Sequence, residues 1–598
     1  MGTPLAPGGR EAGARPRIAG DSPIARVLPD LPLDKVFDYL VPDHLTDQVR
    51  VGTMVRVPLH GRRVGGWVVA LTEAPQTDRP LRPLAKVTGW GPPADVVALA
   101  RWAAWRWAGR PAQLLGTASP PRAVRRLPPR PDAPPPAPGH LADGVTIVRI
   151  PPAGDVLPTA LTVAAREDAL VLTPSHAAAG YLAARLRREG LRVALVPQDW
   201  AQAAAGGCVA VGARAGAWAP RPRLGAVLVV DEGDEAYQEE RAPTWNARDV
   251  AVERARRAGV PCVLTSPCPS LEALGYGPLV TPSRTVERSG WPVVEVVDRR
   301  KEPPGSGLYS ARLVALAREA RPDARLVCVL NRKGRARLLA CATCRELARC
   351  EACGAAVEGA EEGLRCRRCG TARPLICLHC GGTRMATLRV GVSRAREELE
   401  LLANQPVAEV TADSVNGPPP AGVAVLVGTE AVLHRVGGAG AVAFLDVDQE
   451  LLAPRYRAAE TALALLARAA RVVGGRDASG RILVQTRLPG HEVLDAALHA
   501  DPSRLAVVEA ARRAALHFPP ETAVAAVSGQ AAAAFVAALP AGAAVEVLGP
   551  SGPPSGMAGP AHDRWLLRAA DHTILCDALA ATPRPPGRLR VEVDPLRA

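Results

Sequence analysis

The sequence predicts an α/β protein in which two lobes with parallel sheets follow a small β-rich domain. Strand-like apolar runs such as DALVLTP and LGAVLVVDE alternate with amphipathic helical runs from about residue 161 to 279. A second set of this kind begins near Arg325. Such alternation is typical of a parallel sheet with crossover helices. Four C-x-x-C pairs interrupt the second set and indicate a metal-binding insertion there.

Composition and pattern divide the chain into six predicted segments. Short β-like runs such as TMVRVPLH predict the first domain, which ends in a helix around Val96 to Ala108. The run PPRAVRRLPPRPDAPPPAPGH is typical of an extended linker. We expect a disordered tail at 1–23, a β-rich domain at 24–116, a proline-rich linker at 117–158, a first lobe at 159–290, a second lobe at 291–500 with the insertion at 341–380, and a C-terminal αβ domain at 501–598.

The charge balance favours an anionic partner. The net charge is +14 and the pI about 9.6, which is a weak indication of nucleic-acid binding. Only four of the 73 basic residues are lysines, a ratio typical of a GC-rich genome, so arginine richness alone carries little weight. The chain has no long strongly apolar run, and its first residues lack the apolar core of a signal peptide. We therefore expect a cytoplasmic protein with no membrane partner.

Eight of the thirteen cysteines lie within forty residues as four C-x-x-C pairs. Two such pairs supply the four thiolates of a tetrahedral structural zinc site, so four pairs predict two zinc ions and no open position for catalysis. A disulfide framework is the first alternative, but disulfide-dense chains are short and secreted. A thioredoxin-like redox pair is the second, but it needs one pair only. The predicted ligands are Cys341, Cys344, Cys350, Cys353, Cys366, Cys369, Cys377 and Cys380.

Several blocks, taken in order, resemble the PriA family of bacterial replication-restart proteins, which belong to helicase superfamily 2. The blocks are ARVLPDLPLDKVFDYLVP, VVDEGDEAY with ARDVAVERA, LNRKGRARLLAC, and VGTE with LDVDQELLAPRYRAAE. The resemblance covers most of residues 24–598 and implies two RecA-like helicase lobes with a double zinc insertion in the second. It also implies that the outer cysteine pairs hold one zinc ion and the inner pairs the other.

The chain departs from this family where the family binds nucleotide. A phosphate-binding loop needs a lysine beside the phosphates, and this chain has no Gly-Lys dipeptide. Before the first strand of the lobe, where the family has Gly-Ser-Gly-Lys-Thr, the chain reads LTVAAREDALVLTP. The family's DEEH becomes Asp231-Glu232-Gly233-Asp234, a degenerate Walker B motif. Asp231 and Glu232 could still hold Mg²⁺, although an acidic pair at a strand end is also ordinary surface.

The arginine-finger block aligns with residues 468–475, which puts Val472 and Gly475 where the family has its two arginines. Arg471 and Arg476 lie one residue to either side. Because the lysine, the metal and the finger stabilise the transition state together, we expect no ATPase or helicase activity, no catalytic residues, and neither ATP nor Mg²⁺ as cofactor. Two alternatives stay open: an ATP-dependent 3′–5′ DNA helicase with an atypical nucleotide site, and a zinc-ribbon redox sensor.

The resemblance also implies a pocket for the 3′ end of a DNA strand. Phe37, Asp38 and Tyr39 match the block that lines this pocket, with Asp38 accepting a hydrogen bond from the terminal nucleotide. Alternatively, Phe37 and Tyr39 are core positions of a strand. The implied role is to bind stalled forks, 3′ ends and D-loops close to the nucleoid. The implied partners are primosome proteins and the replicative helicase, with single-stranded DNA-binding protein as a further candidate.

Overall fold

The computed structural model describes residues 23–131, 141–303, 307–331, 339–360, 363–366, 368–387, 392–410, 420, 422–551 and 564–596. The predicted disordered tail lies outside these residues except for its last position, as do nine residues of the predicted linker, 132–140. Contacts divide the chain into two compact units. The first contains residues up to Trp102 together with Arg110–Pro129, and the second contains Ala103–Gly109 and Arg130–Ala598.

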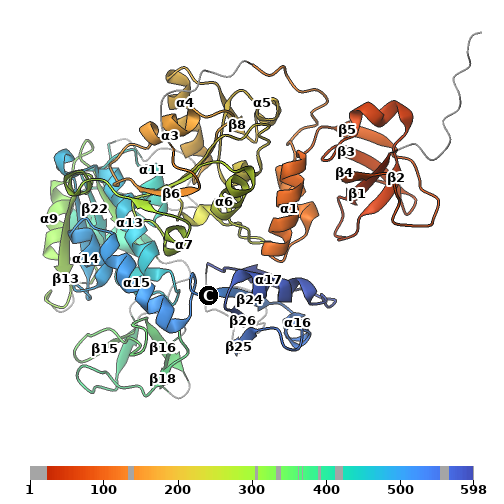
Figure 1. Ribbon diagram of the computed structural model, residues 1–598. Coiled ribbons are helices and arrows are strands. Elements are labelled where there is room, and N and C mark those ends of the chain that lie inside the picture. Colours follow the sequence, from red (N-terminus) through yellow and green to blue (C-terminus); the bar gives the residue numbers. More distant parts are fainter. Residues whose placement is uncertain are drawn as a thin grey trace, which may run out of the picture. The chain divides into compact units, whose positions relative to one another are not determined.

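The first unit is built on an antiparallel sheet (Figure 1). Its strands lie in the order β2-β1-β4-β3-β5. Alternate residues of these strands, among them Val27, Tyr39, Val55 and Val68, point into one core. The strands are β1 (Ile24–Pro29), β2 (Phe37–Leu40), β3 (Met54–Leu59), β4 (Arg62–Thr72) and β5 (Lys86–Gly89), followed by α1 (Ala94–Arg106) and α2 (Pro111–Ala118).

The first lobe of the second unit has a seven-stranded parallel sheet in the order β12-β6-β11-β10-β7-β9-β8. Helices α3 and α4 pack their apolar faces on this sheet through residues such as Val163 and Leu182. The strands are β6 (Val145–Arg149), β7 (Leu170–Leu172), β8 (Val193–Val196), β9 (Val209–Gly212), β10 (Val227–Val230), β11 (Cys262–Ser266) and β12 (Leu279–Val280). The helices are α3 (Leu157–Ala164), α4 (His176–Arg188), α5 (Trp200–Ala205), α6 (Ala247–Ala258), α7 (Leu271–Leu274) and α8 (Arg284–Ser289).

The first lobe begins earlier than the sequence predicts. Strand β6 pairs with β11 and β12, so residues from 145 onwards belong to the lobe and not to the linker that we expected to run to 158. The proline-rich composition on both sides of this five-residue strand hid it from pattern analysis. The difference matters because it moves the first strand–loop–helix unit of the lobe to residues 145–164.

The second lobe has a six-stranded parallel sheet in the order β13-β23-β22-β14-β21-β20. Helix α13 has a long alanine- and leucine-rich face that is buried in the core of this lobe. The strands are β13 (Val293–Asp298), β14 (Leu326–Val329), β20 (Val407–Val410), β21 (Val425–Gly428), β22 (Ala441–Phe444) and β23 (Arg481–Thr486). The helices are α9 (Ala311–Glu319), α10 (Val392–Ala403), α11 (Ala431–Arg435), α12 (Asp448–Leu451), α13 (Ala458–Val473), α14 (Glu492–Leu498) and α15 (Ser503–Leu516).

The cysteine-rich insertion lies between β14 and α10 of the second lobe (Figure 1). Two short strands enclose it, β15 (Leu339–Cys341) and β19 (Met385–Thr387), which pair with each other. Inside it, β16 (Val357–Ala360), β17 (Gly363–Cys366) and β18 (Ala372–Arg373) form a small antiparallel sheet. The insertion is therefore closed off by its own first and last strands.

An antiparallel sheet in the order β25-β26-β24-β27 forms the C-terminal domain. Its first strand begins at Ala523, whereas α15 still contributes Leu505 to the core of the second lobe, so the domain starts later than the predicted residue 501. The elements are β24 (Ala523–Ser528), α16 (Ala532–Ala537), β25 (Val545–Ser551), β26 (Arg564–Ala569), α17 (His572–Ala581) and β27 (Arg590–Val593).

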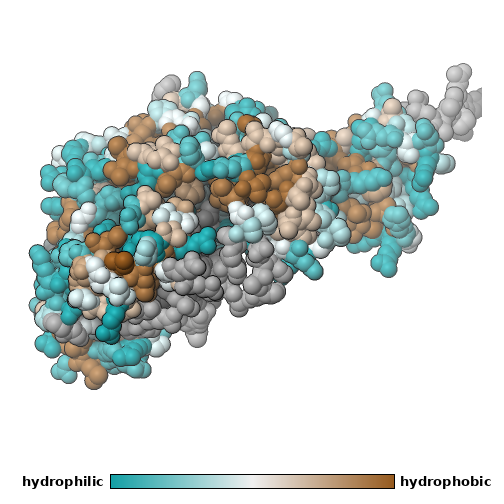
Figure 2. All heavy atoms as spheres, turned by 90° about the horizontal axis from the view of Figure 1, so that it is seen from below, coloured by the Kyte–Doolittle hydropathy of each residue, from teal (hydrophilic) through white to brown (hydrophobic). Residues whose placement is uncertain are grey.

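Among the described residues, no helix has both the length and the apolar character needed to cross a membrane. The face of the molecule in Figure 2 carries hydrophilic residues over much of its area, with hydrophobic residues in separate patches.

Candidate metal centres and the contacts between the lobes

The eight cysteines form two groups of four, and within each group the Sγ atoms lie within 4.8 Å of one another. Four sulfurs at the usual zinc–sulfur distance of about 2.3 Å in a tetrahedron lie about 3.8 Å apart, so both groups fit such an ion. All eight cysteines are free, and a disulfide would need sulfurs about 2.05 Å apart. The closest Sγ pairs are Cys341–Cys380 at 3.6 Å, Cys344–Cys377 at 3.5 Å, Cys350–Cys369 at 3.4 Å and Cys353–Cys366 at 3.5 Å.

All four C-x-x-C turns have one backbone geometry. In each, the residue after the second cysteine donates its N–H to the carbonyl of the first cysteine, at 2.8 to 3.0 Å. That residue adopts a left-handed conformation, which only glycine reaches without strain. The four residues are Arg345, Gly354, Gly370 and Gly381, with φ of 61°, 71°, 78° and 73°. The turns therefore aim both thiols of a pair to the same side.

The two centres differ in exposure. In the inner centre three of the four cysteines are buried, whereas in the outer centre Cys380 is exposed and Cys344 is half-buried. In each centre one thiol has a lowered pKa. Hydrogen bonds from the backbone lower the pKa of Cys341 to about 6, and the hydrogen bond with Cys353 lowers that of Cys366 to about 5. At neutral pH each centre thus already favours a thiolate, which is the form that binds metal.

Contacts at the inner centre fasten the insertion to the rest of the second lobe. The Arg368 guanidinium donates to the carbonyls of Cys353 at 3.2 Å and Ala453 at 2.9 Å. The Ala356 N–H donates to the carbonyl of Leu452 at 3.0 Å. Loss of the inner centre would therefore loosen the insertion on the lobe as well as its internal fold.

The loop between β6 and α3 stands where a phosphate-binding loop would stand, after the first strand of the lobe and before its helix. The position expected from the sequence, at 161–174, is wrong, because residues 157–164 are already helical. The loop itself reads IPPAGDV at 150–156 and contains one glycine and no lysine. With β6 as the first strand of the lobe, the loop to compare is 150–156. This loop also lacks the sequence of a phosphate-binding loop.

Several backbone amides in this loop and at the start of α3 are engaged within the protein. The Ala153 N–H donates to Gly290 O at 3.1 Å, and the Gly154 N–H to Pro151 O at 2.7 Å. The Leu157 N–H donates to the Asp155 carboxylate at 3.0 Å. Prolines at 151, 152 and 158 have no N–H to offer. The Asp155 carboxylate thus occupies the Leu157 amide at the start of α3.

Asp231 and Glu232 follow strand β10 but point in different directions. The Glu232 side chain is buried and accepts hydrogen bonds from Arg248 at 3.0 Å and from the Ser270 amide and hydroxyl at 2.8 and 2.9 Å. Asp231 adopts a left-handed conformation with φ of 51° and is 23% exposed. Its carboxylate accepts two hydrogen bonds from Arg471 of the second lobe, at 2.7 and 3.0 Å.

The arginine beside the expected finger position is therefore the residue that sequence reasoning passed over. In the sequence, Arg471 lies one residue before Val472, which stands at an expected finger position. In the structure it crosses from α13 to the first lobe, where the charge of Asp231 raises its pKa. The sequence shows Arg471 on a predicted helix and acidic residues from Asp231 onwards. With so many arginines in the chain, however, it does not indicate which one pairs with Asp231.

The three residues of the predicted DNA-end pocket lie on β2. Tyr39 is buried in the core and donates its hydroxyl hydrogen bond to Pro58 O at 3.1 Å. Phe37 packs partly against the same core, with the Lys35 ammonium 5.5 Å from its ring. Asp38 accepts a hydrogen bond from the Gln76 amide at 2.6 Å and lies 3.5 Å from Arg26. The Asp38 side chain is only 3% exposed, and its carboxylate contacts both the Gln76 backbone amide and Arg26.

Two RecA-like lobes, a cysteine-rich insertion in the second and a β-rich N-terminal domain define the class of helicase-like proteins with a double metal-binding insertion. Comparison with known proteins narrows this class to one family. Residues 26–120 match the family model for the PriA 3′DNA-binding domain. The chain is 30% identical over 597 residues to the probable replication restart protein PriA of Mycobacterium leprae, covering 88% of this chain and 91% of that protein. The chain belongs to the PriA family.

Other relatives agree with this assignment. The probable replication restart protein PriA of Mycobacterium tuberculosis strain H37Rv is 29% identical over 560 residues, which covers 83% of this chain and 85% of the relative. The replication restart protein PriA of Bacillus subtilis is 27% identical over 383 residues, which covers 58% of this chain and 47% of that protein.

Proposed function

We propose that this protein is a replication-restart scaffold that works without ATP hydrolysis. It binds stalled or abandoned forks and D-loops in the cytoplasm, near the nucleoid. There it recruits primosome components and the replicative helicase, with single-stranded DNA-binding protein as a further candidate partner. Membership of the PriA family and the match of residues 26–120 to a 3′DNA-binding domain support the DNA-binding part of this proposal.

The proposal that the protein does not hydrolyse ATP rests on the loop at 150–156. Catalysis of phosphoryl transfer depends on positioning and on charge stabilisation by a lysine, a metal ion and a finger arginine. Here the loop has no lysine, the Ala153 and Gly154 amides bond within the protein, and Asp155 is paired with Arg185 by two hydrogen bonds at 2.7 and 2.6 Å. The one charged residue of the loop is thus an acid, and it is already paired.

We further propose that each four-cysteine group holds one Zn²⁺ as a structural ion. Four thiolates are the ligand set that structural zinc prefers, and the sulfur spacing fits its tetrahedral radius. Zinc would supply folding energy to an insertion whose strands are two to four residues long. With all four positions taken by sulfur, the ion offers no site for substrate.

For DNA contact we propose the β2 strand with Phe37, Asp38 and Tyr39. Asp38 is the residue whose carboxylate faces the loop around Gln76, and binding a terminal hydroxyl there would require Asp38 to exchange the Gln76 amide for the DNA end. Asp38→Asn keeps the size of the side chain but removes its charge. We expect it to weaken binding to forks with a free 3′-OH more than to blunt duplex.

The test combines ATP turnover with DNA binding by the purified full chain. We expect tight binding to forked DNA with a 3′-OH at the branch, weaker binding to duplex, and no ATP turnover above background with or without DNA. DNA-stimulated turnover would refute the motorless part of the proposal. Equal affinity for fork and duplex would refute the fork-binding part.

A second candidate is an ATP-dependent DNA helicase with an atypical nucleotide site. The acidic pair Asp231 and Glu232 at the end of β10 favours it, because this is where a helicase lobe holds Mg²⁺. A filter assay with labelled ATP separates the two candidates. Retention of ATP that is lost in Asp231→Asn would support the helicase, and its absence in the wild-type chain would exclude it.

A further inference from the structure

The second lobe presents a polar stripe towards the first lobe from helix α13. Glu460, Ala464, Arg468 and Arg471 lie three or four residues apart and so share one face of the helix. Arg455 and Arg457 precede the helix in the sequence. The opposite face of α13 is buried in the core of its own lobe, so the direction of this stripe is set by packing.

The first lobe contacts this stripe through the acidic segment that follows β10, residues 231–235. Asp231, Asp234 and Glu235 each pair with a different arginine of the second lobe. Arg471 binds Asp231 through two parallel hydrogen bonds at 2.7 and 3.0 Å, Arg468 binds Asp234 at 2.7 Å, and Arg455 binds Glu235 at 3.2 Å. The remaining acid of the segment, Glu232, turns inward to Arg248. The eroded nucleotide motif therefore serves as a contact surface.

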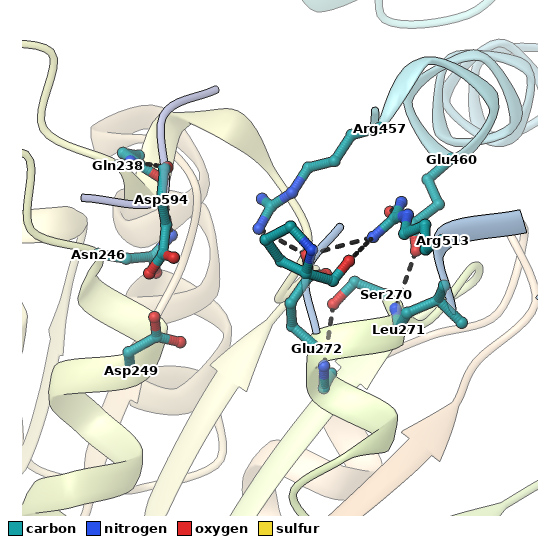
Figure 3. A network of polar contacts seen from close by, with 12 residues as sticks. Gln238, Asn246, Asp249, Ser270, Leu271, Glu272, Arg457, Glu460, Arg513 and Asp594 are labelled. Atoms are coloured by element: carbon teal, nitrogen blue, oxygen red, sulfur yellow. Dashed lines mark hydrogen bonds and ion pairs between the residues drawn. The ribbon is translucent and has the colours of Figure 1, made fainter. Parts of the chain in front are cut away.

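A more deeply buried part of the same interface centres on Glu272 of α7 (Figure 3). Figure 3 shows the guanidinium groups of Arg457 and Arg513 approaching Glu272, with Glu460 beside Arg513. Arg457 lies 2.7 Å and Arg513 3.3 Å from the Glu272 carboxylate. Glu460 pairs with Arg513 and also accepts a hydrogen bond at 2.8 Å from the Leu271 amide of the first lobe. Each buried carboxylate here thus contacts at least one guanidinium, so the charges of the buried groups offset one another.

A third set of contacts lies at the edge formed by α8, β6 and the α14–α15 connection. Arg149 donates to the Ser503 hydroxyl at 2.6 Å while also pairing with Glu287 at 2.8 Å. Arg284 donates to the carbonyls of Ala500, at 2.5 Å, and of His499. The contacts between the lobes thus extend from the nucleotide position to α15.

We propose that these contacts form a fixed clasp that holds the two lobes in one arrangement without nucleotide, with Arg471 occupying the carboxylate that would otherwise bind Mg²⁺. In a motor, the lobes change their separation as nucleotide binds and leaves the cleft. Here Arg471, whose side chain is 49% exposed, fills that position through a bidentate pair, which is stronger than a single hydrogen bond. The inference goes beyond the proposed scaffold function, because a protein without ATPase activity could equally have loose lobes.

The clasp explains two local features. Asp231 is one of the few non-glycine residues with positive φ, a conformation that asparagine and aspartate tolerate best. That conformation directs the Asp231 carboxylate to Arg471 of the second lobe, while the adjacent Glu232 side chain points to Arg248 of its own lobe. In addition, Arg471 donates to Pro152 O at 3.3 Å, so the same side chain contacts the loop that replaces the phosphate cradle.

The test measures the distance between the lobes in the full chain. Spin labels are introduced as unnatural amino acids at Tyr181 on α4 and Leu401 on α10, because the chain has thirteen cysteines; these side chains are 65% and 83% exposed. Pulsed electron paramagnetic resonance should give one narrow distribution of the distance between the two labels. Adding Mg-ATP or Mg-ADP should leave this distribution unchanged. A wild-type distribution that is broad, or that shifts with nucleotide, would overturn the clasp.

Variants separate the clasp from general stability. Arg471→Gln combined with Arg468→Gln should broaden the distribution and speed amide exchange in residues 231–238 by about tenfold, the effect of about 1.4 kcal/mol. Arg476→Ala, an exposed arginine beyond the helix, is the matched control and should change neither. Far-UV circular dichroism and zinc content show that both variants are folded. An unchanged distribution in the double variant would overturn the proposal, whereas ATP turnover by the wild type with fixed lobes would overturn only the motorless function.

Discussion

Asp594 near the end of the chain accepts a hydrogen bond at 2.6 Å from Arg106 at the end of α1, across 488 residues of sequence. His572 approaches the other Asp594 oxygen at 2.9 Å, and the Gln238 amide donates to the Asp594 carbonyl at 2.8 Å. Figure 3 shows Gln238 beside Asp594, above Asp249. Arg106, the first lobe and the C-terminal domain, all within the second unit, therefore meet at one residue, Asp594.

Replacing Asp594 should detach the C-terminal domain from this junction. Burial alone would raise the pKa of Asp594, but the charges and hydrogen bonds of Arg106 and His572 together outweigh it and hold the pKa well below its usual range. Asp594→Ala leaves Arg106, which is 8% exposed, without its carboxylate, and such a loss typically destabilises by about 3–5 kcal/mol. Amide exchange in α17 and β27 of the variant should rise towards that of an opened domain.

A pair on strand β27, which ends just before Asp594, provides the control. Glu592 pairs with Arg590 at 2.8 Å, and the Arg590 side chain is 41% exposed. Exposed pairs contribute about 1 kcal/mol or less, so Glu592→Ala should leave exchange in α17 close to that of the wild type. Similar exchange in both variants would show that the Asp594 contact does not hold the domain.

Much of the lobe architecture could be predicted because its signals are local. Buried strands such as AVLVV and the alternating helices carry their pattern within a dozen residues, and the C-x-x-C pairs show themselves by spacing alone. The structure brings the outer cysteine pairs together in one group and the inner pairs in another, which is the grouping that the family resemblance implies.

The contacts between distant segments could not be predicted. Arg471 and Asp231 lie 240 residues apart, and nothing in a chain rich in arginine distinguishes the one that crosses to the other lobe. Strand β6 was missed because five residues between proline-rich segments carry too little pattern. The left-handed conformation of Arg345 was also missed, although the glycines at the same position in the other three turns were a usable signal.

The cysteine turns predict opposite effects for two substitutions at equivalent positions. Arg345→Gly should stabilise the outer centre, and Gly354→Ala should destabilise the inner one, each by about 1 kcal/mol, because only glycine reaches positive φ without strain. An added Cβ at Gly354 meets nothing within 4 Å, so the effect is purely of the backbone. Zinc release to a chelator should become slower in the first variant and faster in the second. Arg345→Ala keeps the strain without the long side chain, and a gain equal to that of Arg345→Gly would contradict this account.

The two metal centres should differ in what their loss does to the protein. Cys353→Ser and Cys380→Ser should each reduce zinc from two ions to one per chain, measured by elemental analysis. Cys353 is buried and its carbonyl accepts a hydrogen bond from Arg368, whereas Cys380 is exposed. Amide exchange around Ala356 and Leu452 should therefore increase in Cys353→Ser and change little in Cys380→Ser. Cys208→Ser, outside the insertion, should retain both ions. Equal exchange in the two zinc-site variants would refute the difference.

Acid should loosen helix α14 through His491. This residue is the N-cap of α14, where its Nδ1 accepts the Val493 N–H at 3.2 Å, and burial lowers its pKa to about 4. The unfolded state, with a pKa near 6.5, binds the proton more readily, so the helix is most stable above pH 6.5 and loses up to about 3 kcal/mol as the pH falls to 4. Amide exchange in α14, corrected for intrinsic rates, should show this loss. His491→Asn caps the helix without titrating and should flatten the dependence, and an unchanged slope in that variant would assign the effect to another group.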